Sequence, residues 1–524
     1  MGLLPVLLLL AALFAPATPQ FDVSRPGIDV LRYTFNLTLS DRSNVIEGDA
    51  RVTVRFTEGP RDFYLDLVSR HSDDTGMTVA EVSMDGKPVH FDHKQNRLWI
   101  HPGDDPVDSV ETFGIVYRGV PADGLVISKN LYGDRTFFAD NWPYRARHWI
   151  PTVDVPSDKA LVDFIVTAPD HYQVISNGRL VEETDVAPGL RLTHWSTTEA
   201  IPTKIMVIGV ARFAVQYLGD VGGIPVETWV YPQARKAGFY DFAVAGPILK
   251  YYTQVIGPYP FAKLANVQST TRYGGMENAS AIFYDERAVR GAGALESIVA
   301  HEVAHQWFGD SATEDDLHDV WLSEGFATFM DYLYSEHSYG PARLADRLAA
   351  DRLRIIAYAT ANPTSSVVDT TIADPNLVLS TNSYEKGGWT LQMLRVLLGD
   401  ETFFDALRSY YEQYRYGNAT TRDFEKVVES VSGKDLRWFF DQWIYRPGVP
   451  DISVRSRYDA NGRQVVLDVE QKQKLTYRLQ LEVEIAAGQQ ESTETVELTQ
   501  RRQTIRIKVA GKPDSVRLDP NVKI

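Results

Sequence analysis

Residues 293–310 read GALESIVAHEVAHQWFGD, a stretch with helical spacing and a glycine near its C-terminal end. On a helix, positions i and i+4 lie on the same face, so His301 and His305 can bind one Zn²⁺ together. Glu302, one residue along, would stand beside the metal, where a general base can take the proton of an attacking water. The same short pattern also arises by chance, and the alternative is a helix with two incidental histidines.

A catalytic zinc ion usually has three protein ligands and one open position. The sequence has no cysteine and 11 histidines, so a metal would be bound by His, Asp or Glu. In the segment WLSEGFA, Glu324 follows His305 after a gap of 18 residues. This gap leaves room for a turn and a second helix, on which Glu324 would complete a His₂Glu set. Asp331 falls near the same face of that helix, where it would either hydrogen-bond a histidine ligand or be solvated.

A second motif, Gly274-Gly275-Met276-Glu277-Asn278, precedes this helix pair. A glycine pair in a strand permits the close approach of another backbone, so a peptide could pair with this edge as an added strand. Glu277 would then place a carboxylate at the end of the groove, where it suits a cationic α-amino group. The alternative is a simple turn with an exposed glutamate.

Together these motifs resemble the M1 (gluzincin) family of zinc aminopeptidases. The family's exopeptidase motif Gly-x-Met-Glu-Asn appears as GGMEN, and its zinc motif His-Glu-x-x-His-x₁₈-Glu is intact over residues 301–324. NSYEKGG aligns Tyr384 with the family's transition-state tyrosine, and residues 138–160 resemble its N-terminal domain signature. DLRWFFDQW and VRLDP resemble later landmarks, so the resemblance covers nearly the whole chain after its first 20 residues.

The resemblance implies a zinc-dependent aminopeptidase (EC 3.4.11), a hydrolase that removes the N-terminal residue from peptides with a free N-terminus. It implies one Zn²⁺ per chain, bound by His301, His305 and Glu324. Glu302 is then the general base, and Tyr384 donates a hydrogen bond to the developing oxyanion. The residues implied to bind the substrate are Gly274, Gly275, Met276, Glu277 and Asn278.

Two departures from the family's pattern bear on substrate binding. Many members carry a helical-repeat domain after the β-sandwich; this chain stops at Ile524, so we expect a more open cleft that accepts longer peptides. The family often has Gln or Glu nine residues before the proline that matches Pro151, where it helps to hold the substrate amine. Here that position is Trp142, beside Asp140 and Asn141, so a second amine anchor is not identified.

Hydrophobic periodicity divides the chain into three parts. Alternation of period two, typical of half-buried antiparallel strands, continues to about residue 215 and returns near the end of the chain. Helical spacing appears over residues 237–258 and dominates from about 290 to 445, until Gly448-Val449-Pro450 interrupts it. The core positions that alternation predicts are Leu31, Tyr33, Phe35, Leu37, Leu39, Ala50, Val52, Val54 and Phe56, and later Leu479, Leu481, Val483, Ile485, Ile505, Ile507 and Val509.

We therefore predict a multidomain α/β protein. A signal peptide (1–20) would precede an N-terminal β-sheet domain (21–215). A mixed α/β zinc catalytic domain (216–449) would follow, which the resemblance makes thermolysin-like. A C-terminal β-sandwich would occupy residues 450–524.

The N-terminus reads MGLLPVLLLLAALFAPATPQ, in which residues 3–14 form a 12-residue apolar run, too short to span a bilayer. Ala15-Pro16-Ala17 supplies small residues at a cleavage site, so we interpret this stretch as a signal peptide. The alternatives are a buried N-terminal helix and an uncleaved anchor. No second apolar run is long enough for a membrane helix, and we expect an exported protein, periplasmic or secreted, without a membrane span after cleavage.

The composition excludes several classes of protein. With 53 basic and 69 acidic residues the net charge is −16, which argues against a nucleic-acid-binding protein. Hydrophobic residues make up 44% and charged residues 23%, ordinary values for globular proteins, so a disordered or fibrous chain is not expected.

Three other functions are alternatives to the aminopeptidase. An inactive M1-like scaffold would have lost a metal ligand or the base, and here all are present. A zinc endopeptidase is disfavoured because an anchored amine excludes internal bonds. A bifunctional relative that also opens a lipid epoxide has no positive support in the sequence. The preferred first residue and the oligomeric state do not follow from the sequence.

Overall fold

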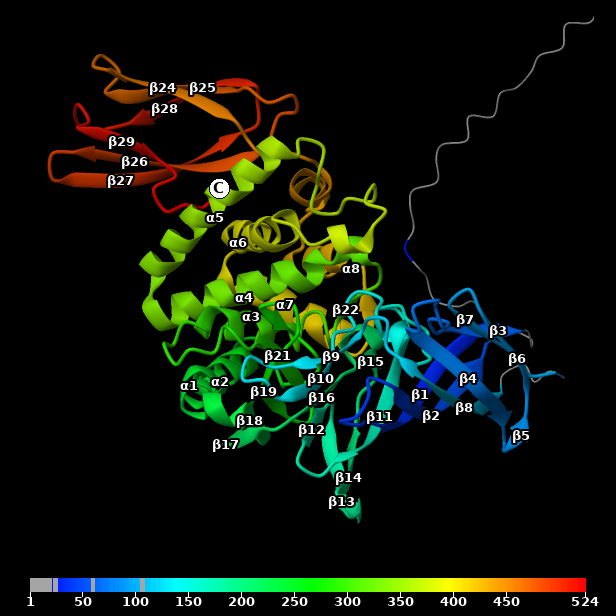
Figure 1. Ribbon diagram of the computed structural model, residues 1–524. Coiled ribbons are helices and arrows are strands. Elements are labelled where there is room, and N and C mark those ends of the chain that lie inside the picture. Colours follow the sequence, from blue (N-terminus) through cyan, green and yellow to red (C-terminus); the bar gives the residue numbers. More distant parts are fainter. Residues whose placement is uncertain (1–20, 22–26, 58–61, 104–108) are drawn as a thin grey trace, which may run out of the picture.

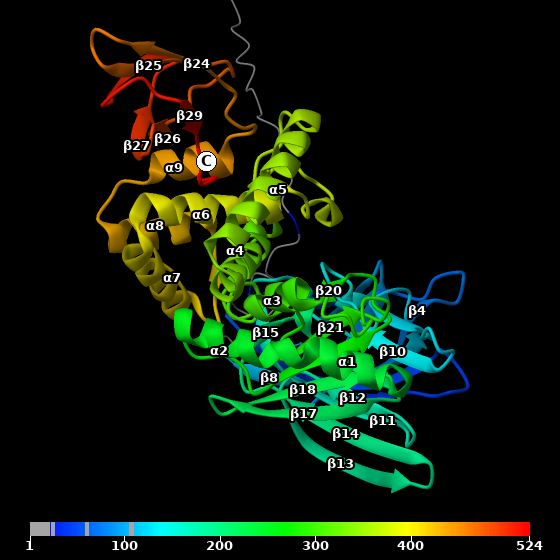
Figure 2. The same cartoon turned by 90° about the vertical axis from the view of Figure 1, so that its left-hand side faces the viewer.

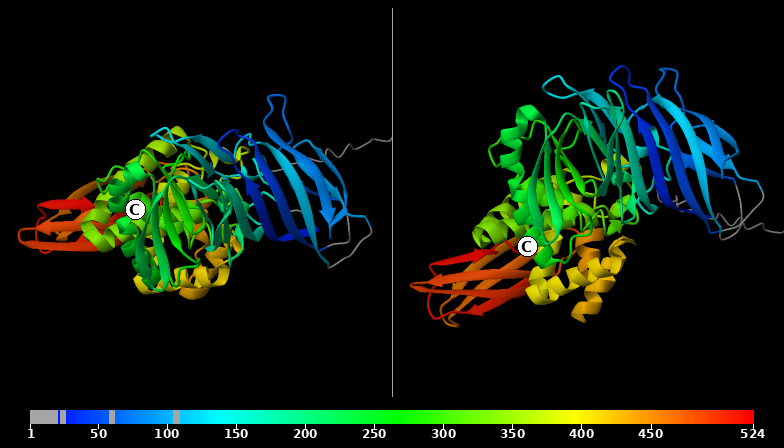
Figure 3. Two further views of the ribbon diagram at one scale, coloured as in Figure 1. Left: turned by 60° about the horizontal axis from the view of Figure 1, so that its bottom comes forward. Right: turned by 90° about the horizontal axis from the view of Figure 1, so that it is seen from below.

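The computed structural model describes residues 21, 27–57, 62–103 and 109–524 (Figure 1). The predicted signal peptide, residues 1–20, lies outside the described residues. In the part of the chain that is described, no helix is both long and apolar enough to cross a membrane. Figure 3 shows the large N-terminal sheet and the C-terminal sheets at opposite ends of the molecule, with the helices between them.

The N-terminal part forms three sheets within the described residues. The largest has nine strands in the order β13-β14-β11-β1-β2-β8-β4-β5, with β15 paired to β11, and the others have the orders β12-β16-β10-β9 and β3-β7-β6. The strands of the largest sheet are β1 (Ile28–Thr38), β2 (Ile46–Phe56), β4 (Gly76–Met84), β5 (Lys87–Pro88), β8 (Val110–Val120), β11 (Lys159–Pro169), β13 (Arg179–Ala187), β14 (Leu190–Ser196) and β15 (Ile201–Pro202). Those of the smaller sheets are β3 (Phe63–Asp66), β6 (His90–Lys94), β7 (Arg97–His101), β9 (Leu125–Lys129), β10 (Arg135–Ala139), β12 (Gln173–Ser176) and β16 (Ile208–Ala211).

Burial along the first two strands follows the predicted alternation, with one exception. The side chains of β2 that were predicted to face the core are buried, namely Ala50, Val52, Val54 and Phe56. In β1 the prediction for Leu31 is wrong, because Leu31 is only half-buried and Val30 takes the core position. A β-bulge between Val30 and Arg32 shifts the pairing with β2, and the side chains on the two sides of a bulge change face.

The next part of the chain contains a five-stranded sheet in the order β17-β18-β19-β21-β20. Its strands are β17 (Ala214–Val221), β18 (Ile224–Val230), β19 (Leu264–Ser269), β20 (Gly275–Met276) and β21 (Ala281–Asp285). The strand β20 lies at the sheet edge and belongs to the motif GGMEN, so the structure places this motif where an added strand could pair. The predicted division between residues 215 and 216 falls inside β17, and the domain limits remain predictions.

Helices dominate the chain from Glu296 to Phe440, as predicted. Their bounds, with those of two earlier helices, are α1 (Arg235–Asp241), α2 (Ala245–Val255), α3 (Glu296–His305), α4 (Trp321–Tyr339), α5 (Pro341–Ala361), α6 (Gly387–Leu398), α7 (Asp400–Tyr414), α8 (Thr421–Ser432) and α9 (Arg437–Phe440). Two short strands, β22 (Thr313–Glu314) and β23 (Asn418–Ala419), pair between them. Figure 2 shows α5 and α6 next to the C-terminal sheets, and α3 and α4 nearer to the five-stranded sheet.

The C-terminal part consists of two three-stranded sheets that lie one against the other (Figure 1). One contains β24 (Ile452–Asp459), β25 (Gln464–Gln471) and β28 (Arg502–Lys508), and the other contains β26 (Leu479–Ala487), β27 (Gln490–Leu498) and β29 (Ser515–Leu518). The predicted core residues of β26 are buried, namely Leu479, Leu481, Val483 and Ile485. The multidomain α/β fold with terminal β regions is therefore confirmed.

Candidate active site

Three predicted metal ligands meet between α3 and α4, which pack against each other. His301 Nε2 lies 3.1 Å from Glu324 Oε2, and His305 Nε2 lies 3.3 Å from the same oxygen. The three ligand atoms all lie within 4.8 Å of one another. Two imidazoles and one carboxylate that converge in this way form the donor set of a catalytic zinc site, so the residues present fit this metal.

The orientation of His305 is fixed from behind the site. Its Nδ1 lies 3.0 Å from Ser323 Oγ and 3.2 Å from the carbonyl oxygen of Phe308. These contacts occupy Nδ1 and leave Nε2 for a metal ion, the arrangement that positions most metal-binding histidines. Ser323 directly precedes Glu324, so the same turn of α4 supplies one ligand and orients another.

The prediction that Asp331 could hydrogen-bond a histidine ligand is wrong. Its carboxylate accepts hydrogen bonds from Ser297 Oγ at 2.6 Å and from Arg347 Nη1 at 2.8 Å. Arg347 belongs to α5. Its guanidinium binds the Asp331 carboxylate in preference to an imidazole, because the two side chains are oppositely charged and form two hydrogen bonds. Asp331 is buried at the edge of the cavity, so the alternative of a solvated side chain is wrong as well.

The Glu302 carboxylate lies in the cavity between α3 and β20. A Cβ atom added to Gly275 would lie only 2.2 Å from Glu302 Oε1, so this glycine leaves room for the Glu302 side chain. Burial raises the pKa of the Glu302 carboxyl well above its usual value, and the nearby carboxylates of Glu277 and Glu324 raise it further, although His305 opposes them. A carboxylate with a raised pKa is a better proton acceptor, as a general base requires.

Glu277 is buried in the same cavity, and one side chain holds its backbone against α3. Gln306 Nε2 donates to the carbonyl oxygen of Glu277 at 2.7 Å and to Asp310 Oδ2 at 2.7 Å. Gln306 Oε1 accepts from the backbone N–H of Ser280 at 2.8 Å and from the hydroxyl of Tyr259 at 3.0 Å. The zinc motif and GGMEN are thus connected by hydrogen bonds. Sequence reasoning missed Gln306, although it directly follows His305.

The remaining residues of GGMEN separate into two groups. Gly274, Gly275, Met276 and Glu277 line the cavity, whereas Asn278 does not. Asn278 is fully buried, and its Nδ2 donates to the carbonyl oxygen of Met276 at 3.5 Å. Its backbone carbonyl oxygen accepts a hydrogen bond from the backbone N–H of Ala281. In this structure Asn278 stabilises the turn between β20 and β21.

Tyr384 lies on a π-helical turn, Asn382–Lys386, and its ring stacks on that of His301 with centroids 5.8 Å apart. Burial raises the pKa of its phenol well above 10, and the Glu324 carboxylate raises it further. The phenol therefore keeps its proton and can donate a hydrogen bond. The close approach of α4 and α6 at this point depends on Gly325, where an added Cβ would lie 3.0 Å from the Cα of Gly387.

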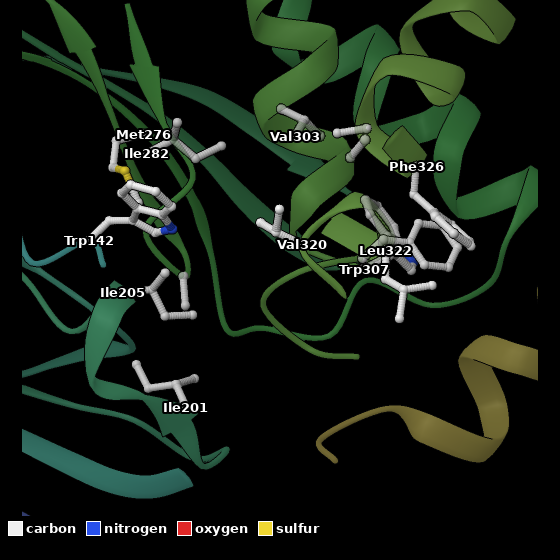
Figure 4. Close-up of a cluster of buried hydrophobic side chains, with 14 of the residues drawn as sticks. Trp142, Ile201, Ile205, Met276, Ile282, Val303, Trp307, Val320, Leu322 and Phe326 are labelled. Atoms are coloured by element: carbon white, nitrogen blue, oxygen red, sulfur yellow. The ribbon is translucent and has the colours of Figure 1, made fainter. Parts of the chain in front are cut away.

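The cavity has a volume of about 350 Å³ and an apolar wall. Trp142, Tyr273 and Met276 line it, and the rings of Trp142 and Tyr273 meet edge to face at 6.1 Å. Figure 4 shows the ring of Trp142 against Met276.

Nothing among the described residues near Trp142 supplies a second free carboxylate for a substrate amine. Asp140, which the sequence places beside it, is buried and forms ion pairs with Arg145 and Arg272. Asn141 donates to the backbone carbonyls of Thr203 and Met206. Both side chains are therefore engaged in structural contacts, whereas Glu277 is one of the acidic residues that line the cavity.

Comparison with known proteins supports the resemblance to the M1 family. The Peptidase M1 N-terminal domain matches residues 30–205, and the Peptidase family M1 domain matches residues 240–443. The probable aminopeptidase 2 of Sulfurisphaera tokodaii is 28% identical over 417 residues, which cover 76% of this chain and 52% of that protein. The leucyl aminopeptidase of Saccharolobus solfataricus is 26% identical over 487 residues, covering 87% of this chain and 59% of that protein. The chain thus spans about half the length of the curated relatives it matches.

Solved structures share the fold over most of the chain. A two-domain M1 zinc metallopeptidase variant bound to L-tryptophan superposes with a TM-score of 0.72 at 21% identity, covering 83% of this chain and 98% of that one. The M1 zinc metallopeptidase from Deinococcus radiodurans superposes with a TM-score of 0.70 at 23% identity, covering 81% and 95% of the two chains. The family models and the shared fold agree with the motifs, and this chain belongs to the M1 family of zinc metallopeptidases.

Proposed function

We propose that this chain is a zinc-dependent aminopeptidase that hydrolyses the N-terminal residue from peptides with a free α-amino group. The observation that carries the proposal is the position of Glu277, a buried carboxylate in the cavity that also holds the His₂Glu set and Glu302. An α-ammonium group bound by Glu277 would leave space for only one residue before the scissile bond. The names of two relatives, leucyl aminopeptidase and aminopeptidase N, support the same activity.

We propose that one Zn²⁺ per chain is bound by His301, His305 and Glu324. When bound there, the ion would polarise the scissile carbonyl and make the attacking water more acidic. The donor set is buried and convergent, and the carboxylates of Glu277 and Glu302 leave the site with an excess of negative charge that a divalent cation would offset.

The reaction can be followed through the protein's own groups. Glu302 takes a proton from the attacking water and passes it to the nitrogen of the leaving peptide, so that the C–N bond breaks with a neutral amine. Tyr384 donates its phenolic hydrogen to the oxygen on which negative charge develops. Glu277 holds the α-ammonium group in place during both steps. Water is added across the peptide bond, and every protein group returns to its starting state.

The apolar wall suggests which substrates are preferred. Because Trp142, Tyr273 and Met276 line the cavity next to Glu277, we propose that they receive the side chain of the first residue. Two aromatic rings and a thioether bind large apolar side chains better than charged ones, since only the former gain by leaving water.

The most direct experiment combines metal analysis with a panel of chromogenic aminoacyl amides, each with and without an N-acetyl cap. We expect one equivalent of tightly bound zinc and cleavage of the uncapped compounds only, fastest for aromatic and large aliphatic residues. Cleavage of capped compounds at comparable rates would favour the endopeptidase alternative. A zinc-containing protein that cleaves neither set would favour the inactive scaffold.

Replacement of Tyr384 by Phe tests the oxyanion donor. We expect kcat to fall on the order of 10²-fold, because one donor to a developing oxyanion is lost, while zinc content and KM change little. The matched control is Tyr410→Phe, since the Tyr410 hydroxyl is buried and has no hydrogen-bond partner in the described structure. The assignment fails if Tyr384→Phe retains the turnover of the control.

We also propose that residues 1–20 direct export of the protein to the periplasm or the exterior. The support is the sequence pattern of a short apolar run followed by small residues. Fractionation of producing cells, with N-terminal sequencing of the recovered protein, tests this. We expect exported protein that begins after Ala17 or shortly beyond, and recovery of an intact N-terminus in the cytoplasm would contradict it.

A further inference from the structure

The small sheet β3-β7-β6 carries a second group of side chains with donor atoms that suit a metal ion, and Figure 1 shows this sheet well apart from α3 and α4. In the antiparallel pair of β6 and β7, His90 lies directly opposite His101. Asp92 follows His90 by two residues and therefore projects from the same face of the sheet. Two imidazoles and a carboxylate are thus brought together by strand pairing alone.

The distances within this group are those of a site that could close around an ion. One ligand atom from each of His90, Asp92 and His101 lies within 4.8 Å of the other two. His101 Nε2 is 3.5 Å from Asp92 Oδ2, and the two imidazole rings lie with centroids 5.0 Å apart. A tetrahedral zinc ion with ligand distances of about 2 Å needs only small side-chain rotations to bind all three.

A fourth residue orients His101 toward the group. Asp62 Oδ1 lies 2.8 Å from His101 Nδ1, within hydrogen-bond distance. A proton on Nδ1 that faces this carboxylate leaves the lone pair on Nε2, the ring nitrogen that lies 3.5 Å from Asp92 Oδ2. That Nε2 atom is buried and has no hydrogen-bond partner in the part of the chain that the structure describes. A carboxylate behind a histidine whose other nitrogen is free is the usual arrangement around a protein-bound metal.

We propose that His90, Asp92 and His101 form a second zinc-binding site on the N-terminal sheet, with Asp62 as the residue that orients His101. The ligand is a divalent cation that prefers imidazole and carboxylate donors, for which zinc is the best candidate in a site of low coordination number. Three protein ligands would leave one position to water. The ion would connect β6 to β7 at the surface and take no part in hydrolysis.

The surroundings predict a moderate affinity. Lys94 Nζ lies 3.4 Å from Asp92 Oδ2, so its ammonium group competes with a cation for this carboxylate. His90 is exposed, and the side chains of Asp92 and His101 are 43% and 24% exposed, so a bound ion would be only partly shielded from water. We therefore expect the second ion to dissociate at higher free zinc concentrations than the ion in the buried catalytic site.

The test is equilibrium dialysis of the full chain against buffered zinc, from about 0.1 to about 100 µM free metal, a range that brackets micromolar affinity. Wild-type protein is expected to bind a second zinc ion in this range, and His101→Ala and Asp92→Asn to lose it while retaining the first ion and peptide hydrolysis. Lys94→Ala is expected to bind the second ion several-fold more tightly.

The matched control is His171→Ala, which removes a surface histidine that also lies 3.5 Å from an aspartate, Asp41, but belongs to no group of three ligands in the described structure. This variant should bind two ions. A single ion in the wild type over the whole range overturns the proposal. So does a second ion that persists in both His101→Ala and Asp92→Asn, because its ligands would lie elsewhere.

Discussion

Glu302→Gln is expected to reduce kcat on the order of 10³-fold while the zinc content stays that of the wild type. The amide keeps the shape of the side chain but cannot accept the proton of the attacking water. Because Glu302 is absent from the His₂Glu set, the metal ligands are left in place. Steady-state kinetics on an uncapped aminoacyl amide, together with metal analysis of the same sample, measures both quantities.

A matched substitution on the same helix separates this effect from damage to α3. Glu296→Gln changes a carboxylate at the start of α3 that accepts a hydrogen bond from Tyr339 and does not line the catalytic cavity. It should leave kcat close to the wild-type value. Near-normal turnover of Glu302→Gln would remove Glu302 from the role of general base.

Glu277→Ala is expected to abolish most of the preference for a free N-terminus. Loss of one partner of a buried charge pair costs about 2–5 kcal/mol, so kcat/KM for uncapped substrates should fall by roughly 30- to 5,000-fold. N-acetylated substrates carry no ammonium group, and their slow background cleavage should change little. The informative quantity is the ratio of kcat/KM for uncapped and capped forms of one amide.

The control for Glu277→Ala removes the carboxylate of Glu286, which lies next to the same five-stranded sheet. Glu286 directly follows β21 and accepts a hydrogen bond from the backbone N–H of Leu131, away from the cavity. Glu286→Ala should preserve the ratio. An equal loss on capped and uncapped substrates in Glu277→Ala would show that the residue supports the structure of the cavity without binding the amine.

Spacing along the chain was sufficient to predict that His301, His305 and Glu324 converge, because helical geometry is local. His301 and His305 are one turn apart, and the gap before Glu324 allows two helices to pack, as α3 and α4 do. The spacing of Asp331 along α4 likewise predicted that it lies near the helix face that carries Glu324. Its partner was not predictable, since Arg347 reaches it from α5 and only the folded structure shows which neighbour is nearest.

Other features depend on contacts between distant segments, which no local pattern records. The bulge that buries Val30 in place of Leu31 arises from pairing with β2, so a regular alternation in the sequence mislabels one residue. Tyr384 was identified by resemblance alone. Its place beside His301 depends on the backbone contact between Gly325 and Gly387, which are separated by 61 residues in the sequence but touch in the fold.

The hydrogen bonds of Gln306 have a consequence for how this sequence can change during evolution. Its amide group satisfies the backbone of the GGMEN turn from the helix that carries the histidines, so neither segment can shift alone without leaving buried polar groups unpaired. Since both contacts are to backbone atoms, a substitution at Gln306 should disturb the turn whatever side chains the turn carries. GGMEN and the zinc motif, which are separate in the sequence, would then be under a common constraint through this one residue.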